Sequence, residues 1–186
     1  AVAPVFCMLL RKHLSGGKVI DIQFHDYERI VTLLIESVNE LGDLNVKKLI
    51  IEIMGRYSNI ILTTSDDKII DSIKHVDNEI SSVREVMPAR PYVLPPAQNK
   101  ENPENLDVEA FIRESVNSGL SLEKYLLDSI KGFSPLICRE ICARAAIEGK
   151  KNLSMLGSEE IIKFEACLKD IINSIKESRF TPCIAY

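Results

Sequence analysis

Two short stretches place arginine at predicted turns, where a side chain can reach a ligand. Arg29 follows Glu28 at the start of an apolar segment, and Arg56 stands between two β-rich segments with Asn59 close behind. A guanidinium group binds phosphate through two parallel hydrogen bonds or stacks on a base, and a neighbouring carboxylate can hold it in place. These residues are candidate RNA contacts. The structural alternatives are a solvated hairpin edge for the first pair and ordinary turn chemistry for the second.

A third basic group stands near the end of a predicted amphipathic helix. It consists of Arg11, Lys12 and His13. A cation near phosphate stabilises RNA binding, and each such contact steepens the salt dependence. This group is therefore another candidate RNA contact, and its alternative is a solvated helix face with His13 at an internal interface.

The stretch 127–141 resembles a helix-hairpin-helix motif, with apolar positions on both sides of Gly132 and Ser134. Such a motif holds nucleic-acid phosphates with backbone N–H groups at the N-terminus of its second helix. Lys131 and Arg139 add positive charge nearby. The usual pattern has a second glycine where Ser134 stands. An ordinary αα-hairpin with a capping serine therefore stays open as the alternative.

No stretch has the spacing of a catalytic site, because the sequence lacks a nucleophile elbow, a phosphate-binding glycine loop and a metal-ligand pattern. Five cysteines are present, an odd number without a Cys-x-x-Cys pair, which is typical of reduced thiols in the cytoplasm. Cys138 and Cys142 share a helix face and would need further ligands from elsewhere to hold a metal. We expect a cytoplasmic protein that is not an enzyme and has no cofactor or metal.

The composition restricts the partners. The formal net charge of −4 excludes a strong global attraction to nucleic acid, so any RNA contact uses a local basic patch. No apolar run reaches the length of a membrane span, and no signal peptide is visible. We therefore expect no membrane partner.

Alternating apolar residues predict antiparallel strands in the first hundred residues. The predicted strands are 18–24, 29–37, two strands within 47–64 on either side of Gly55, and 68–73, and a helix is predicted at 5–14. In the strand before Gly55, one face is apolar and the other is mixed because it includes Glu52.

Five prolines between residues 77 and 105 predict an extended strap or linker. Helical periodicity follows it, with Asp107 and Ser121 as predicted N-caps of the first two helices. Ser134 followed by Pro135 predicts the start of the third helix. We expect a β-rich domain over 1–100, a helical domain over 101–180, and the start of a following segment, a strand, at 181–186.

Four stretches carry a resemblance to a known family. They are Glu-Ile-Met-Gly-Arg-Tyr-Ser-Asn-Ile-Ile-Leu (52–62), Pro-Val-Phe-Cys-Met-Leu-Leu-Arg-Lys-His-Leu (4–14), Ile-Asp-Ser-Ile-Lys (70–74) and Tyr-Val-Leu-Pro-Pro-Ala-Gln-Asn-Lys (92–100). Together they resemble the NFACT family over nearly the whole chain. The resemblance implies an α+β fold, an incomplete antiparallel β-sandwich similar to the N-domain of formamidopyrimidine-DNA glycosylases, followed by an all-α helix-hairpin-helix domain. In the family a β-rich segment precedes the 4–14 stretch, so we expect a fragment with an open sheet edge.

The resemblance also implies a function. A family member binds the stalled large ribosomal subunit and recruits tRNA, alanyl-tRNA in bacteria, so that alanine tails are added to nascent chains. The ribosome makes the bond, so the protein is a binding factor. Glu28 and Arg29 stand where the family carries an Asp-Arg pair that engages tRNA, with glutamate in place of aspartate. Two alternatives stay open, a surface adhesin that binds fibronectin and a stand-alone nucleic-acid-binding module.

Overall fold

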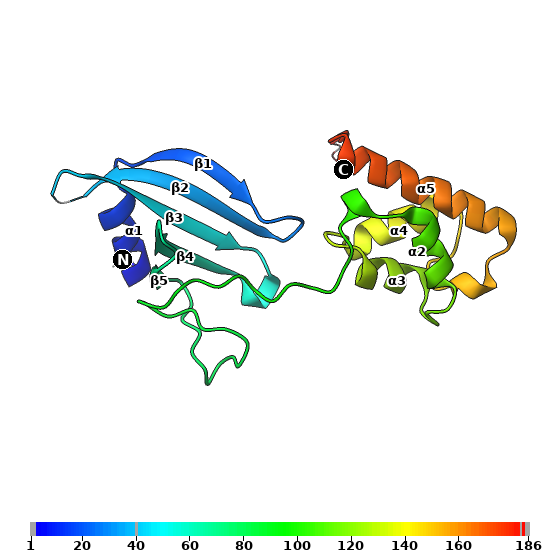
Figure 1. The fold of residues 1–186 in the computed structure, drawn as a ribbon, viewed down its shortest axis with the longest axis horizontal. Coiled ribbons are helices and arrows are strands. Elements are labelled where there is room, and N and C mark those ends of the chain that lie inside the picture. The colour runs from blue at the N-terminus through cyan, green and yellow to red at the C-terminus, as the bar shows by residue number, and fades with distance from the viewer. Residues whose placement is uncertain (1–2, 40, 183, 185–186) are drawn as a thin grey trace. The chain divides into compact units, whose positions relative to one another are not determined.

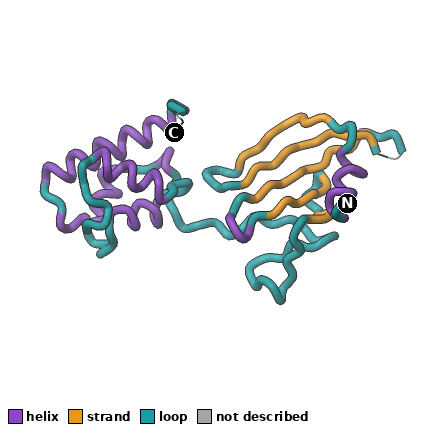
Figure 2. Tube along the Cα trace, turned by 180° about the vertical axis from the view of Figure 1, so that it is seen from behind, coloured by secondary structure: helices purple, strands orange, loops and turns teal. Residues whose placement is uncertain are grey.

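The computed structural model describes residues 3–39, 41–182 and 184. The chain forms two compact units, Ala1–Ala97 and Gln98–Tyr186. The first unit holds all the strands, and the second holds helices α2 to α5 (Figures 1 and 2). Each unit has its own cluster of buried apolar side chains, so each is described by itself.

The first unit contains a five-stranded antiparallel sheet in the order β1-β2-β3-β4-β5. The strands are β1 (Lys18–Phe24), β2 (Ile30–Val38), β3 (Leu44–Glu52), β4 (Asn59–Thr64) and β5 (Ile69–Ser72). Each strand pairs with its neighbour in sequence, and a single 3-10 turn, η1 (Gly55–Tyr57), lies between β3 and β4. The strands predicted from alternation are confirmed, with their ends shifted by a few residues.

Helix α1 (Val5–Leu14) packs on one face of this sheet, against β2 and β5. The chain turns from α1 into β1 through Gly17, where a Cβ atom would lie 2.9 Å from Ile35 Cγ2. Only a residue without a side chain allows this close approach of the turn to β2. The helix predicted at 5–14 is confirmed.

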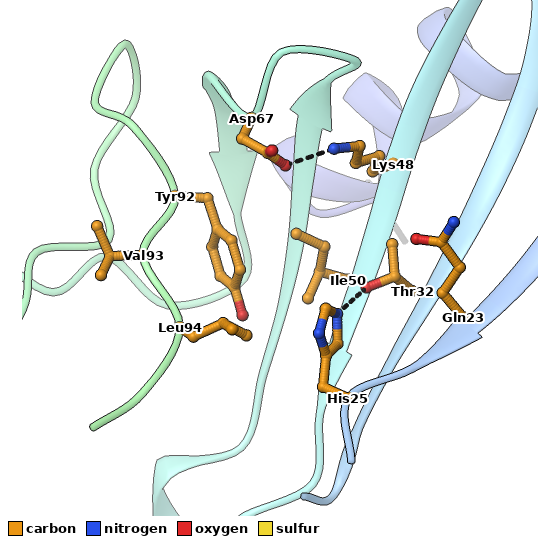
Figure 3. A pocket seen from close by; sticks show the side chains of 9 residues that line it. All are labelled: Gln23, His25, Thr32, Lys48, Ile50, Asp67, Tyr92, Val93 and Leu94. Carbon is orange, nitrogen blue, oxygen red and sulfur yellow. Dashed lines mark hydrogen bonds and ion pairs between the residues drawn. The ribbon is translucent and has the colours of Figure 1, made fainter. Parts of the chain in front are cut away.

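The strap, defined here as residues 77–97, covers the opposite face of the sheet. Its side chains Val86 and Tyr92 pack against a buried cluster formed by Ile30, Ile50, Ile61 and Ile69. The strap also covers the edge of β5, since the Ile69 N–H donates to the Arg90 carbonyl (2.8 Å). Figure 3 shows the strap at the left, with Tyr92 between the strap and the strands, and a helix behind the strands. The proline-rich segment is therefore extended and ordered against the sheet.

Strand β1 forms the other edge of the sheet and is exposed along its whole length. Val19, Ile22 and Phe24 are 49%, 52% and 71% exposed. The residues that the structure describes form one sheet, without a second sheet facing it, because α1 and the strap lie on its two faces. A sandwich would require further strands.

The second unit is built from short helices around a larger apolar cluster that includes Phe111, Leu126, Ile141 and Phe164. Its elements are η2 (Pro103–Asn105), α2 (Val108–Ser115), α3 (Leu122–Ser129), α4 (Pro135–Arg144), η3 (Leu153–Met155) and α5 (Ser158–Lys176). None of the helices in the described part of the chain has the length and apolarity needed to cross a bilayer.

Of the N-caps predicted for α2 and α3, only the one at α2 makes capping hydrogen bonds. Asp107 caps α2 by accepting hydrogen bonds from the N–H groups of Glu109 and Ala110, both at 3.1 Å, as predicted. Ser121 occupies the N-cap position of α3, but its side chain makes no capping hydrogen bond. The strand predicted at 181–186 is not formed at residues 181, 182 and 184, and its other residues lie outside the described part of the chain.

Candidate nucleic-acid interface

The turn between β1 and β2 places Glu28 and Arg29 at one end of the sheet. Asp26 adopts a left-handed conformation (φ 50°), and the Glu28 N–H donates to the His25 carbonyl at 2.9 Å, which closes the turn. Arg29 is exposed and Glu28 is half-buried. The side chain of Arg29 makes no ion pair with any described residue, so its guanidinium is available to a ligand.

The same end of the sheet carries Arg56. The Ile53 N–H donates to the Arg29 carbonyl at 2.8 Å, and this bond joins the β1–β2 turn to the chain leaving β3 (Figure 1). In the next turn, the Arg56 guanidinium lies 4.6 Å from the centre of the Tyr57 ring and donates to its hydroxyl. A stacked, extended guanidinium of this kind presents its remaining N–H groups to solvent. The structure thus brings together two of the arginines predicted to contact RNA.

Asn59 has a different position from the one we predicted. It is 5% exposed, and its amide nitrogen donates to the Lys74 carbonyl at 2.8 Å while its oxygen accepts from the Lys74 and Ile60 N–H groups. A buried amide with its donors and acceptors used in this way has little to offer a ligand. Asn59 therefore holds the β3–β4 connection against the chain after β5. Its contact with RNA stays a prediction.

Lys74 is a cation that the sequence analysis missed. Its ammonium group donates to the Arg56 carbonyl at 3.1 Å and forms no ion pair with a described carboxylate. Arg56, Tyr57 and Lys74 line a hollow of about 980 Å³. The strap forms its other wall, with Val83, Arg84, Pro95 and Pro96 among the lining residues. The hollow is apolar inside and cationic at its rim, which suits a planar ring that carries phosphate.

A smaller hollow of about 470 Å³ lies on the strap-covered face of the sheet (Figure 3). Its polar side chains are paired with one another: His25 lies 3.2 Å from the Thr32 hydroxyl, and Lys48 forms an ion pair with Asp67 at 2.8 Å. Polar groups that are already paired gain less from a ligand. The arginine-bearing end of the sheet is therefore the better candidate for a nucleic-acid interface.

The strap side of the larger hollow is fixed by a buried ion pair. Arg84 binds Glu52 through both guanidinium nitrogens, and the Tyr92 hydroxyl donates to the same carboxylate at 2.8 Å. Burial raises the pKa of Tyr92, and the charge of Glu52 raises it further. Burial alone would lower the pKa of Arg84, but the hydrogen bond to Glu52 outweighs it and the net pKa is raised. Tyr92 stays neutral and Arg84 stays charged at physiological pH.

The predicted cluster on α1 lies elsewhere. The His13 carbonyl accepts a hydrogen bond from the Ser37 hydroxyl at 3.0 Å, near the end of β2 opposite to Arg29. At about 3.3 Å per strand residue, the two ends of β2 are roughly 25 Å apart. Arg11 and Lys12 are exposed and His13 is half-buried. The structure does not bring this cluster to the arginine-bearing end of the sheet, so a single small contact cannot include both.

In the second unit, α3 and α4 form an αα-hairpin. Gly132 in the connection has a φ of 75°, a conformation that favours glycine. The Ser134 hydroxyl accepts from the Ile137 N–H at 3.4 Å and caps α4, with Pro135 at the first helical position, as predicted. Gly132, Ser134 and Arg139 are exposed and Lys131 is half-buried. The N-terminus of α4 therefore faces solvent.

The two neighbouring thiols of α4, Cys138 and Cys142, are buried. Burial raises the pKa of Cys138 to about 11 and that of Cys142 to about 12, which keeps both protonated. Among the described residues, no group of three or more histidine, cysteine or carboxylate side chains is arranged to hold a metal ion.

The family of the chain follows from its sequence match. Residues 1–186 match the model of the NFACT N-terminal and middle domains. The chain belongs to the NFACT family. Its curated relatives include the Rqc2 homolog RqcH of Bacillus subtilis (strain 168), which is 39% identical over 182 residues, covering 97% of this chain and 30% of the relative. The archaeal Rqc2 homolog aRqcH of Methanocaldococcus jannaschii is 33% identical over 181 residues, covering 95% of this chain and 25% of the relative.

Solved structures resemble the NFACT chain over most of its length. The fibrinogen binding protein from Staphylococcus aureus has a TM-score of 0.74 and 30% identity, covering 98% of this chain and 61% of that one. The N-terminal part of the fibronectin/fibrinogen-binding protein from Streptococcus suis has a TM-score of 0.67 and 30% identity, covering 91% of this chain and 59% of that one. The NFACT chain thus spans about a quarter to a third of the curated relatives named above and about three fifths of these solved chains.

Proposed function

We propose that the protein carrying this chain is a ribosome quality-control factor that binds a stalled large ribosomal subunit and tRNA, so that alanine is added to the nascent chain. The observation that carries the proposal is the family match over the whole chain, together with 39% identity to an Rqc2 homolog RqcH. In this proposal the protein works in the cytoplasm. The peptidyl-transferase centre of the ribosome makes each bond, and this chain binds and orients RNA without acting as an enzyme.

The proposed tRNA contact is the arginine-bearing end of the sheet. Arg29, Arg56 and Lys74 supply positive charge there without a described carboxylate in ion-pair contact. A local cluster of this kind attracts RNA phosphates although the net charge of the chain is −4. Tyr57 offers a ring on which an unpaired base can stack.

The second proposed contact is the α3–α4 hairpin acting as a helix-hairpin-helix motif. The exposed N-terminus of α4 presents N–H groups and the positive end of the helix dipole to a phosphate. Arg139 lies in the following turn and is exposed. Ser134 replaces the usual second glycine, and its hydroxyl caps the helix, so fewer free N–H groups remain for the phosphate.

The proposal is tested by co-sedimentation and tailing with the full-length protein that carries this chain. We expect it to sediment with large subunits bearing peptidyl-tRNA, and we expect a strain lacking it to lose alanine tails on stalled nascent chains. Absence of both would overturn the proposal. Co-sedimentation without tailing would restrict it to subunit binding.

A second candidate function is fibronectin binding on the cell surface, favoured by the names of the solved relatives, one of which is described as a fibronectin/fibrinogen-binding protein. Cell fractionation and a binding assay on immobilised fibronectin test it. Surface exposure together with saturable binding would favour the adhesin. A protein that remains with ribosomes inside the cell and does not bind fibronectin would exclude it.

A further inference from the structure

Glu52 is the most deeply buried carboxylate among the ion pairs of the first unit. Its side chain is 0% exposed at the end of β3, on the face beneath the strap. Burying a carboxylate is costly unless hydrogen bonds and an opposite charge compensate for it. Both oxygens of Glu52 are satisfied by the strap: Arg84 donates at 2.8 Å to Oε1 and at 2.5 Å to Oε2, and the Tyr92 hydroxyl donates at 2.8 Å to Oε1.

The contacts of Arg84 extend this network to the next part of the strap. The same Nη1 that binds Glu52 also donates to the Val93 carbonyl at 2.9 Å. Tyr92 is the last strap residue whose backbone N–H donates to a residue outside the strap. Its acceptor is the Asp67 carbonyl, at 2.7 Å. Beyond it, residues 93–97 show no backbone hydrogen bond to a strand among the described contacts. The path of the chain toward Pro95 therefore depends on Arg84, which depends on Glu52.

This dependence reaches the candidate RNA site. Arg84, Pro95 and Pro96 line the hollow whose rim carries Arg56 and Lys74. If the strap moves, the wall of the hollow moves with it, while the cations on the sheet side stay in place. The width of the site is thus set by an ion pair that does not itself face the ligand.

We propose that Glu52 is a positioning residue for RNA binding: through Arg84 and Tyr92 it fixes the strap and so sets the shape of the hollow beside Arg56 and Lys74. This inference rests on the proposed function for its ligand. It does not require Glu52 to touch RNA.

The sign of the expected effect separates positioning from simple electrostatics. Glu52 is an anion near a site proposed to hold phosphate, so removing its charge should by Coulomb's law strengthen RNA binding. A positioning role predicts the opposite, because Arg84 loses its charged partner and the strap loosens. Glu52→Gln keeps the size of the side chain and removes only the charge and part of the hydrogen bonding.

The test compares Glu52→Gln with Glu85→Gln in the full chain. Glu85 is the matched control, since it also lies on the strap side and pairs with Arg90, which is 63% exposed, at 3.2 Å. Hydrogen exchange of residues 84–94 reports strap opening, and titration with a tRNA transcript reports affinity. For Glu52→Gln we expect exchange in this segment to accelerate about tenfold and affinity to fall about fivefold or more, with strands β2 and β3 still protected. Glu85→Gln should remain within about twofold of the unmodified chain in both.

Tyr92→Phe is the milder second variant, because it removes one hydroxyl and leaves the ion pair intact. We expect an intermediate acceleration of exchange, about threefold, which keeps the test valid if Glu52→Gln unfolds the whole unit. Tighter tRNA binding by Glu52→Gln, or unchanged strap exchange in both variants, would overturn the inference. The exchange measurement needs no RNA. A failure of the unmodified chain to bind tRNA would therefore overturn the proposed tRNA contact, while the effect of Glu52 on the strap is still judged by hydrogen exchange.

Discussion

Arg29 is the residue whose substitution tests the interface most directly. It is exposed, it makes no ion pair with a described residue, and its backbone carbonyl bonds to Ile53. Arg29→Ala removes the guanidinium and keeps the backbone bond. We expect the free energy of tRNA binding to weaken by about 1 to 3 kcal/mol if the contact is bidentate. The slope of log binding constant against log salt concentration should decrease in magnitude by about one, as expected for the loss of one phosphate contact. Filter binding at several salt concentrations measures both quantities.

Arg113→Ala is the matched control for this prediction, because it deletes the same charge from an exposed position at the end of α2. The free energy of unfolding of each variant should lie within about 0.5 kcal/mol of that of the unmodified chain, as is usual for exposed substitutions. Equal loss of affinity in the two variants would indicate a general charge effect. Normal binding by Arg29→Ala would indicate that the residue is only a hairpin edge.

At the residue scale, the sequence located surface arginines better than it described buried polar groups. Arg29 and Arg56 stand at turns, and turn residues can be predicted from local signals. The partners of Glu52 cannot, because Arg84 follows it by 32 positions and Tyr92 by 40. The sequence indicates this buried network only through a charged residue on the mixed face of a strand. The alternation of residues does not say which face of the sheet is covered.

Helix α4 supplies a prediction at the scale of the element. Ser134 caps its N-terminus, whereas Ser121 holds the same position on α3 without a capping hydrogen bond. Ser134→Ala should therefore destabilise the second unit by about 1 kcal/mol, and Ser121→Ala should cost clearly less. Urea unfolding followed by circular dichroism measures the difference. Equal costs would show that the 3.4 Å hydrogen bond at Ser134 contributes little.

The thiols of α4 give a prediction for pH. The pKa of Cys142 is raised from 9.0 to about 12 by burial, so the folded state holds its proton more tightly than the unfolded state. The stability that this provides is complete below about pH 9 and is lost as the pH rises toward 12. At pH 8, Cys142 in the folded chain should react with iodoacetamide roughly a thousandfold more slowly than in the unfolded chain. Mass spectrometry of the labelled peptides measures the ratio; rapid labelling of Cys142 in the folded chain would contradict its burial.

The elements themselves were largely predictable because their signals are local. Alternation located the strands, and Ser134 with Pro135 marked the start of α4. The strap was different. Its prolines predicted extended chain but not its attachment, which depends on Val86 filling the cluster around Ile50 and on the bonds to β5. Such contacts form between distant parts of the chain, so periodicity does not record them.

At the scale of the whole molecule, charge and partner binding must be considered together. The chain carries 27 acidic and 23 basic side chains, so RNA is repelled on average and attracted only at local clusters. Affinity that depends on a few cations should be moderate and sensitive to salt. This restricts the proposed function, since most of the affinity for a ribosomal subunit would then come from parts of the protein outside this chain.

The two compact units make the last prediction possible, which is that each folds when it is produced alone. Among the described residues, the second unit, Gln98–Tyr186, buries eighteen in one cluster, whereas the cluster beneath the strap in the first unit has five. Burial of apolar surface is the main source of stability, and β1 contributes little because it is exposed throughout. We therefore expect the second unit alone to unfold cooperatively, with a midpoint close to its midpoint in the full chain. The first unit should melt at a lower temperature.

Separate expression of the two units, followed by thermal melting and calorimetry, measures these midpoints. Glu52→Gln provides an internal check, because it should lower the melting temperature of the first unit and leave that of the second unchanged. The tenfold acceleration of strap exchange expected for this variant corresponds to about 1.4 kcal/mol, which is a measurable part of the stability of a small domain. A second unit that fails to fold alone, or a Glu52→Gln effect on its melting, would show that the two units stabilise each other and that the strap acts on more than the sheet.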